Sequence, residues 1–201
     1  TDGGSVKGSV VADAQRAFGA IPPGFVPGHP IAGTERSGVA SSFPELYQHR
    51  RVILTPLPET DSEACARVRA MWEAVGAEVT EMSVAHHDEV LAATSHLPHM
   101  LAFGLVDALA RMRSNDEIFR YAAGGFKDFT RIASSSPEMW RDICIANAEA
   151  LSRMLGRFGD EMRELSETIG RKDGEALLEI FDRARSARDR YVDGVTTTER
   201  R

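Results

Sequence analysis

The chain has 201 residues, of which 42% are hydrophobic and 27% charged, and its net charge is −6. This composition is typical of a soluble globular protein of one domain or two small ones, which needs no disulfide or metal to stabilise its core. The acidic balance argues against nucleic acid or an anionic membrane surface as the partner, and no apolar run approaches the ~18 residues of a membrane helix. The two cysteines, Cys65 and Cys144, show no metal-motif spacing, so we expect a reducing, cytoplasmic location.

Strand-like and helix-like patterns alternate in the first third of the chain. Apolar residues at helical spacing predict a helix over 8–18. The proline- and glycine-rich stretch that follows predicts a short extended segment between turns, and two later apolar runs predict buried strands. The predicted strands are 26–31, 51–54 and 77–82, with a helix from Asp61 or Ser62 to Val75 between the last two, ended by Gly76. Strand, helix and strand over about 30 residues is the signature of a mostly parallel sheet.

Only helical patterns follow residue 83. Apolar residues at steps of three and four predict long helices over 84–112, 137–166 and 174–191, and the polar tail from 192 is expected to fray. Pro98 lies inside the first of these helices and should kink it, because proline has no N–H to donate. We therefore predict an α/β part over 1–83 and an all-α part over 84–201.

A histidine stands between glycine and proline in the segment GHPIAGTE, at the end of a predicted strand. Ligands of open α/β sheets bind at such strand ends. Histidine is also the side chain whose ordinary pKa, ~6.5, suits proton transfer near neutral pH. His29 is therefore a candidate general base, and the alternative is an exposed histidine in a turn.

Four of the six histidines lie close together in the sequence: His86, His87, His96 and His99. In a straight helix His96 and His99 share a face, whereas His87 and His96 point roughly opposite ways. Histidine and aspartate can ligate metals, but no recognisable ligand spacing is present, so we predict no metal. A polar substrate pocket around the Pro98 kink is the favoured interpretation, and histidines that cap or pack helices are the alternative.

Two further motifs could bind anions. In GGFKDFTR, Lys127 and Arg131 lie four residues apart on one helical face, and the arginine could hold a carboxylate through two hydrogen bonds. The alternative is a weak surface ion pair between Asp128 and Arg131. The opening TDGGSVKG is typical of a loop that leads to a helix N-terminus, where anions bind. No G-x-G-x-x-G dinucleotide motif follows a strand anywhere in the sequence.

The segments TDGGSVKG, GHPIAGTERSG, SHLPH and GGFKDFTRIASSSPEMWRDI occur in this order. Together they resemble the prephenate dehydrogenases, called cyclohexadienyl dehydrogenases where arogenate is accepted, from residue 1 to about residue 192. The resemblance implies a partial, Rossmann-like α/β nucleotide-binding domain (1–83) followed by an all-α dimerisation and substrate domain (84–201), mostly α overall. It also implies a cytoplasmic homodimer that uses NAD, or NADP, in tyrosine biosynthesis. The reaction is oxidative decarboxylation of prephenate or arogenate to 4-hydroxyphenylpyruvate or tyrosine.

The same resemblance assigns roles by position. His29 matches the catalytic histidine that accepts the proton of the ring hydroxyl, Ser5 matches the serine that orients it, and Arg131 matches the arginine that binds a substrate carboxylate. The other positions that match the substrate site are Thr34, Glu35, His87, His96, His99, Gly124 and Trp140. The opening loop supplies the implied cofactor contacts, which are Asp2, Ser5 and Lys7. The nicotinamide cofactor carries the redox step, so no metal is implied.

Members of this family begin with a strand, a G-x-G-x-x-G loop and a helix, and the present sequence begins after them, without an initiator methionine or a signal peptide. We therefore expect an active parent enzyme and a chain that by itself dimerises but is inactive. One alternative is a non-catalytic helical dimerisation or ligand-binding fragment. Another is a β-hydroxyacid-type dehydrogenase, which would use a catalytic lysine; no lysine occurs between Lys7 and Lys127.

Overall fold

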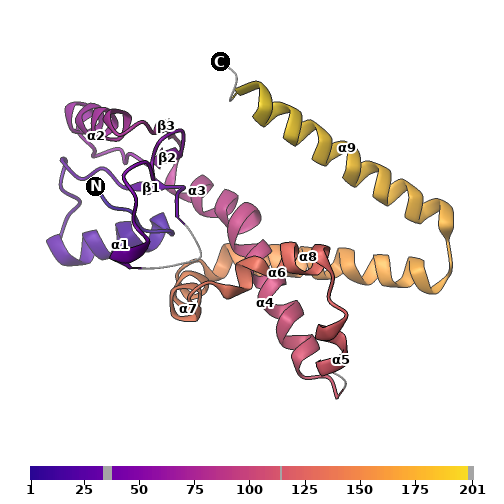
Figure 1. Ribbon diagram of the computed structural model, residues 1–201. Helices are drawn as coiled ribbons and strands as arrows, with labels where there is room; N and C mark the ends of the chain where they lie inside the picture. Colours follow the sequence, from indigo (N-terminus) through magenta and orange to yellow (C-terminus); the bar gives the residue numbers. More distant parts are fainter. Residues whose placement is uncertain (34–37, 114, 199–201) are drawn as a thin grey trace. The chain divides into compact units, whose positions relative to one another are not determined.

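The computed structural model describes residues 1–33, 38–113 and 115–198. The chain forms two compact units, Thr1–Met154 and Leu155–Arg201. Figure 1 shows the elements, which in chain order are α1 (Lys7–Phe18), β1 (Gly28–Pro30), the 3₁₀ turn η1 (Val39–Ser41), β2 (Arg51–Leu54), α2 (Ser62–Ala74), β3 (Glu78–Glu81), α3 (Val84–Leu91), the π turn η2 (Ala92–His96), α4 (Leu97–Ala110), α5 (Asn115–Arg120), α6 (Gly124–Thr130), the 3₁₀ turn η3 (Arg131–Ser134), α7 (Pro137–Ala146), α8 (Ala148–Gly170) and α9 (Gly174–Thr198).

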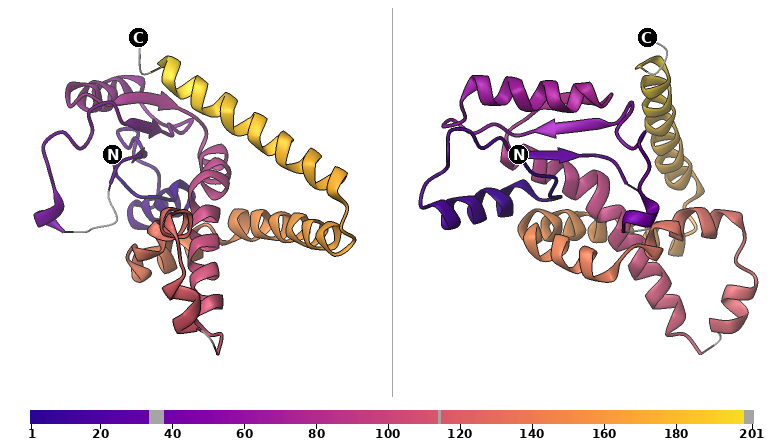
Figure 2. Two further views of the ribbon diagram at one scale, coloured as in Figure 1. Left: turned by 45° about the vertical axis from the view of Figure 1, so that its right-hand side comes forward. Right: turned by 60° about the vertical axis from the view of Figure 1, so that its left-hand side comes forward.

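The described strands form one small sheet in the order β1–β2–β3. β2 and β3 are parallel and are joined through α2, which confirms the predicted strand–helix–strand unit. β1 instead runs antiparallel to β2, with His29 opposite Ile53, so the prediction of a mostly parallel sheet is wrong for this strand. α2 covers one face of the sheet and α1 lies on the other side (Figure 2). The apolar core of the sheet consists of Val26, Val52, Leu54, Ala64 and Ala77.

The predicted helix over 84–112 is interrupted by the π turn η2, which lies between α3 and α4. Pro98 is the second residue of α4 and has no N–H to donate to the preceding turn. A π turn holds one residue more than an α turn, so it rotates the residues after it relative to α3. Both His87 and His96 are fully buried. The expectation that these two side chains point in opposite directions assumed a straight α-helix, which this segment does not form.

The remaining helices differ from the prediction in three places. The short helix α5 lies in a stretch where no helix was predicted, and the helical stretch expected at GGFKDFTR is the short helix α6 followed by the 3₁₀ turn η3. The helix predicted over 137–166 is two helices, because the backbone of Asn147 leaves the helical conformation between α7 and α8. α9 continues through Thr198, into the tail that was expected to fray. None of the helices in the described part of the chain is long and apolar enough to cross a membrane.

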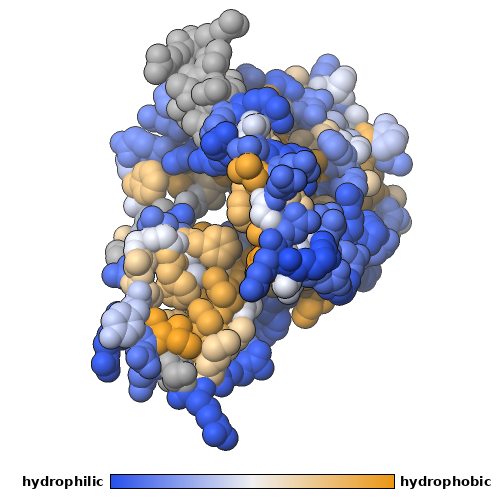
Figure 3. All heavy atoms as spheres, turned by 90° about the vertical axis from the view of Figure 1, so that its right-hand side faces the viewer, coloured by the Kyte–Doolittle hydropathy of each residue, from blue (hydrophilic) through white to orange (hydrophobic). Residues whose placement is uncertain are grey.

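Helices α8 and α9 carry apolar side chains at the surface. Ile169 of α8 and Leu178 and Phe181 of α9 are each more than half exposed. Figure 3 shows apolar residues reaching one face of the molecule among polar ones. Large apolar side chains that stay exposed in the isolated chain are typical of surfaces that another protein covers.

Candidate active site

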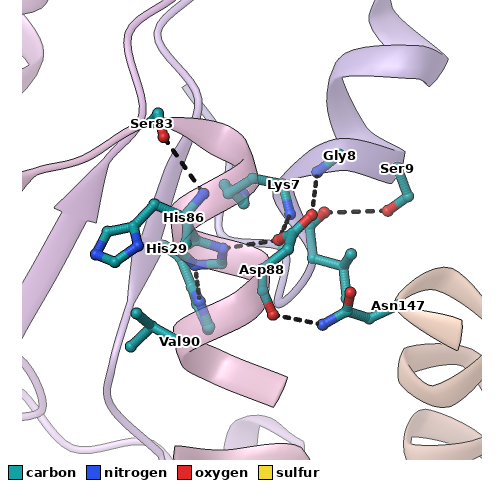
Figure 4. A network of polar contacts seen from close by, with 12 residues as sticks. Lys7, Gly8, Ser9, His29, Ser83, His86, Asp88, Val90 and Asn147 are labelled. Carbon is teal, nitrogen blue, oxygen red and sulfur yellow. Dashed lines mark hydrogen bonds and ion pairs between the residues drawn. The ribbon is translucent and has the colours of Figure 1, made fainter. Parts of the chain in front are cut away.

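The candidate base His29 lies in the middle of β1 and its side chain is only 9% exposed. Its Nδ1 lies 2.8 Å from Nε2 of His87, a fully buried residue of α3. Nδ1 of His87 in turn lies 2.8 Å from Oδ1 of Asp88. The three side chains therefore form one hydrogen-bonded chain, which joins the sheet to α3 (Figure 4).

Asp88 is held by the N-terminus of α1. The backbone amides of Lys7 and Gly8 donate to its two carboxylate oxygens, each at 2.8 Å. α1 has no side-chain cap of its own, since its N-cap residue is Val6. The first amides of a helix favour an anion, as the opening loop predicted, but the anion in this structure is the carboxylate of Asp88.

The hydrogen bonds keep Asp88 ionised. Burial by itself would raise the pKa of this carboxyl group. The hydrogen bonds from His87 and from the amides of Gly8 and Lys7 outweigh that effect, and the pKa lies below its ordinary value. Asp88 is therefore a carboxylate at neutral pH.

For a histidine such as His29, burial by itself lowers the pKa, because it disfavours the charged imidazolium. Desolvation is the largest cause, the Lys7 ammonium and the neighbouring imidazoles act in the same direction, and the pKa of His29 falls to about 3. The expectation of a pKa near ~6.5 is therefore wrong for the ligand-free protein, because it assumed a hydrated imidazole. His29 is neutral throughout the physiological range and can accept a proton without first losing one.

Asp2 and Lys7 are engaged with each other. The Lys7 side chain is fully buried, its Nζ pairs with a carboxylate oxygen of Asp2, and it also donates to the carbonyl oxygen of Gly28 at 2.5 Å. Asp2 also accepts a hydrogen bond from the Gly28 amide at 3.1 Å. The cofactor role that the resemblance implies for Asp2 and Lys7 stays a prediction, and in this structure the buried ammonium group of Lys7 is bound to protein oxygens. The pair fixes the strand residue next to His29.

A second polar group surrounds Trp140 of α7. The ring of His99 stacks on the Trp140 ring at 3.7 Å between centroids, and His99 Nδ1 lies 2.8 Å from the carbonyl oxygen of Ser95. His96 packs edge-on against the same tryptophan. The Nε1–H of Trp140 is buried and has no acceptor in the described ranges 1–33, 38–113 and 115–198. A buried donor without a partner costs about 1–3 kcal/mol, which an oxygen of a ligand could offset.

Asn147 connects the two groups. Its side-chain amide donates to the carbonyl oxygen of Asp88 at 2.8 Å and lies 3.2 Å from Nδ1 of His96. Burial, which outweighs the favourable charge of Asp88, lowers the pKa of His96 to about 4. His96 is therefore a neutral acceptor for the amide of Asn147.

The remaining residues that the sequence assigned to the site lie on other segments of the chain. Ser5 is half-buried and immediately precedes Val6, which packs with Trp140 and Ile143 in a small apolar core. Gly124 is the first residue of α6, Arg131 follows its last residue, and both are exposed. α6 and η3 pack against α4, the helix that carries His99. The two remaining substrate-site predictions, Thr34 and Glu35, lie outside the described residues.

Two family models together match nearly the whole chain. The model of the nucleotide-binding domain of prephenate dehydrogenase matches residues 1–81, and the model of its dimerization domain matches residues 83–183. The chain belongs to the prephenate dehydrogenase family. This confirms the resemblance found in the sequence, and with it the order of a nucleotide-binding domain followed by a helical dimerisation domain.

Relatives of known structure or curated function agree. A cyclohexadienyl dehydrogenase of Zymomonas mobilis is 43% identical over 93% of this chain and 64% of its own length. A prephenate dehydrogenase of Bacillus subtilis is 38% identical over 94% of this chain and 51% of its own length. The structure of Aquifex aeolicus prephenate dehydrogenase with hydroxyphenyl propionate and NAD⁺ has a TM-score of 0.85 and 45% identity, covering 93% of this chain and 65% of that one. The chain thus spans 51–65% of the length of these family members.

The sequence did not single out three residues that contribute to the candidate site, which are Asp88, Asn147 and Gly8. Asp88 directly follows His87, and a carboxylate beside a buried histidine was the available signal. Asn147 is a polar residue at a position of the helical apolar pattern, which signals a buried hydrogen bond. The approach of Gly8 to the Asp88 carboxylate had no sequence signal, because it depends on how α1 and α3 pack.

We expect Gly8→Ala to destabilise the protein. A Cβ at this position would lie 2.9 Å from Oδ2 of Asp88, so the carboxylate would have to leave the amides that hold it. Alanine improves helix propensity by at most ~1 kcal/mol, whereas hydrogen bonds to a charged group contribute about 1.5–3 kcal/mol each. The free energy of unfolding in urea should therefore fall by about 1–3 kcal/mol. Gly3→Ala is the matched control, since its Cβ would meet only Pro30, at 3.8 Å; equal losses in the two variants would contradict this account.

We also expect the protein to lose stability on acidification. Unfolded histidine protonates near pH ~6.5, whereas folded His29 and His96 have pKa values of about 3 and about 4. Between these values the unfolded chain binds more protons, so the free energy of unfolding should fall by on the order of 4 kcal/mol from about pH 7 to about pH 5. His29→Asn and His96→Asn should each remove about half of this dependence. His86→Asn, a change on the exposed face of α3, should keep it, and an unfolding free energy that is flat over this range would refute the account.

Proposed function

We propose that the protein catalyses the oxidative decarboxylation of prephenate or arogenate with NAD⁺, to 4-hydroxyphenylpyruvate or tyrosine, with NADP⁺ as the other nicotinamide that could serve. The observation that carries this proposal is His29, a buried neutral imidazole whose Nδ1 is hydrogen-bonded to His87, which in turn is hydrogen-bonded to Asp88. A ring nitrogen prepared in this way is suited to take a proton from a substrate hydroxyl. A scaffold without catalysis would need no such chain of side chains.

Bound NAD⁺ supplies the acceptor of the hydride that leaves C4 of the substrate ring. His29 accepts the proton of the 4-hydroxyl group as this hydride leaves. The ring carboxylate is then lost as CO₂, and the ring becomes aromatic. His29, protonated by the first step, can return its proton to the phenolate oxygen of the product, which leaves the base neutral for the next turnover.

A protein of net charge −6 needs local hydrogen-bond donors and cations to bind the carboxylates of the substrate. Arg131 is our candidate for a side-chain carboxylate, because a guanidinium group can hold a carboxylate through two hydrogen bonds. Trp140 offers a buried Nε1–H without an acceptor among the described residues, and the ring of His99 lies stacked on it. We assign Gly124, together with Thr34 and Glu35, to the same substrate site. His87 and His96 act behind it, since both are fully buried.

The opening loop does not fit a cofactor phosphate. The amides of Lys7 and Gly8 bind Asp88, and the Lys7 ammonium binds Asp2 and Gly28. Ser5 is half-buried beside these residues, and its hydroxyl fits an amide or hydroxyl group of a ligand. We therefore keep Ser5 as the contact of this loop with the nicotinamide end of the cofactor and with the substrate hydroxyl.

We further propose that the two domains meet near residue 83 and that the helical domain forms a homodimer in the cytoplasm. Matches that end at residue 81 and begin at residue 83 support the boundary. The exposed apolar residues of α8 and α9, among them Ile169, Leu178 and Phe181, support a second copy as the partner.

The proposed function is tested by incubating the full-length protein with prephenate, or with arogenate, and either NAD⁺ or NADP⁺. We expect the absorbance of the reduced nicotinamide to rise together with release of CO₂ in equal amounts. Full-length protein that is folded but reduces neither cofactor with either substrate would refute the proposal.

A further inference from the structure

His29 ends a chain of hydrogen bonds whose other end is fixed by backbone groups. The amides of Lys7 and Gly8 lie 2.8 Å from the two oxygens of Asp88. Distances of 2.8 Å also separate Asp88 from His87 and His87 from His29. A backbone N–H can only donate, so Asp88 accepts at this end of the chain, and with both imidazoles neutral the direction of each further hydrogen bond follows.

The positions of the hydrogens then follow one by one. A carboxylate has acceptors only, so the hydrogen between Asp88 and His87 belongs to Nδ1 of His87. A neutral imidazole carries one N–H, which leaves Nε2 of His87 as an acceptor. The hydrogen between the two rings therefore belongs to Nδ1 of His29. Nε2 of His29 is left with its lone pair.

We infer that His87 and Asp88 are positioning residues, which hold His29 in the tautomer with hydrogen on Nδ1 and the lone pair on Nε2. The catalytic use of this lone pair rests on the proposed function, whereas the tautomer itself does not. The arrangement matches the way in which the carboxylate of a serine protease holds its histidine. Here a second imidazole lies between the carboxylate and the base, and the N-terminus of α1 fixes the carboxylate.

The full burial of His87 lets it hold His29 in one tautomer. No water can replace its Nε2 as the acceptor for His29, because the side chain is 0% exposed. The same contact also stabilises the cation formed when Nε2 of His29 takes a proton, since the Nδ1–H of an imidazolium is a stronger donor. His87 therefore does not contact the substrate, although the resemblance placed it in the substrate site.

The first test is nuclear magnetic resonance of the full-length protein labelled with ¹⁵N in its histidines, without substrate and at neutral pH. We expect His29 to be protonated on Nδ1 only and His87 on Nδ1 only. A hydrogen on Nε2 of His29, or hydrogens on both nitrogens of His87, would overturn the inference without any variant being made.

The second test replaces His87 with leucine, which fills the space but cannot accept a hydrogen bond. We expect the hydrogen of His29 to move to Nε2, at least in part. We expect kcat to fall by about 10²–10⁴-fold, because the wrong tautomer disables a histidine base to this extent. His86→Leu, on the exposed face of the same helix, should keep both the tautomer and kcat. A folded His87→Leu variant with unchanged kcat and an unchanged His29 tautomer would show that His87 only packs.

Gly8→Ala perturbs the same chain from its far end and leaves both histidines in place. Displacing the Asp88 carboxylate should weaken its bond to His87 and populate the second tautomer of His29, whereas Gly3→Ala should not. An identical His29 spectrum in the two variants would count against the role of Asp88. If the spectra agree with the inference but the protein oxidises neither substrate, the proposed function fails and the tautomer assignment stands.

Discussion

Replacing His29 with asparagine should lower kcat by about 10²–10⁴-fold, the usual effect of removing a general base. The asparagine amide can still donate to His87, so the strand and the buried network should stay in place. It has no ring nitrogen that can take a proton from the substrate hydroxyl. KM for prephenate and the affinity for NAD⁺ should change little, and steady-state kinetics of the full-length protein measure both. A His29→Asn variant with the original kcat would remove His29 from the mechanism.

The pH dependence of kcat/KM gives this prediction a second readout. The profile reports the free enzyme, in which burial lowers the pKa of His29 to about 3. Protonation of His29 should therefore cause no loss of kcat/KM between about pH 8 and about pH 5. A loss of activity with a midpoint near pH ~6.5 would mean that His29 is hydrated in the free enzyme.

Replacing Arg131 with alanine should raise KM for the cyclohexadienyl substrate by at least about 30-fold. Removing one partner of a desolvated charge pair costs on the order of 2–5 kcal/mol, and each 1.4 kcal/mol is about tenfold in affinity. kcat should fall less than KM rises, because the lost contact is made to the bound substrate as well as in the transition state. Steady-state kinetics with varied substrate measure both constants.

Two comparisons make the Arg131 prediction specific. Arg131→Lys should restore little of the affinity, since a lysine lacks the planar pair of donors that matches a carboxylate. Arg141→Ala should leave the kinetics unchanged, because Arg141 lies exposed on α7 in an ion pair with Asp142. If Arg131→Ala weakened NAD⁺ and substrate equally, the residue would be structural and not a substrate ligand.

Local patterns predicted those elements that local interactions determine. α1, β2, α2 and β3 follow from apolar periodicity and from caps such as Asp61, which accepts from the Glu63 amide as its position suggested. The antiparallel pairing of β1 could not be predicted, because GHP is short and its direction is set by contacts with β2. The end of α7 at Asn147 was also hidden, since the apolar period of three and four continues across it.

Local patterns could not predict the surroundings of the candidate site residues. The catalytic role of His29 stays a prediction, and its pKa depends on burial, which no local pattern shows. The resemblance implied a cofactor contact for Lys7, whereas in this structure its ammonium group is buried against Asp2. Asp88 and Asn147 act through contacts between segments about 80 and about 50–60 residues apart. Such contacts become visible only once the helices are packed.

The π turn at Ala92–His96 absorbs one residue more than an α turn, so it sets which side chains of α4 face α7. If the segment became a regular α-helix at its present length, all of α4 would rotate by about 100° relative to α3. That rotation would take His96 away from Asn147 and His99 away from Trp140. Deleting one residue within Ala93–Ser95 should instead convert the π turn to an α turn and keep α4 in its present alignment, whereas inserting one residue there should disrupt both contacts. The extra residue thus acts as a phase shift, which sets the register between two polar clusters at the expense of helix regularity.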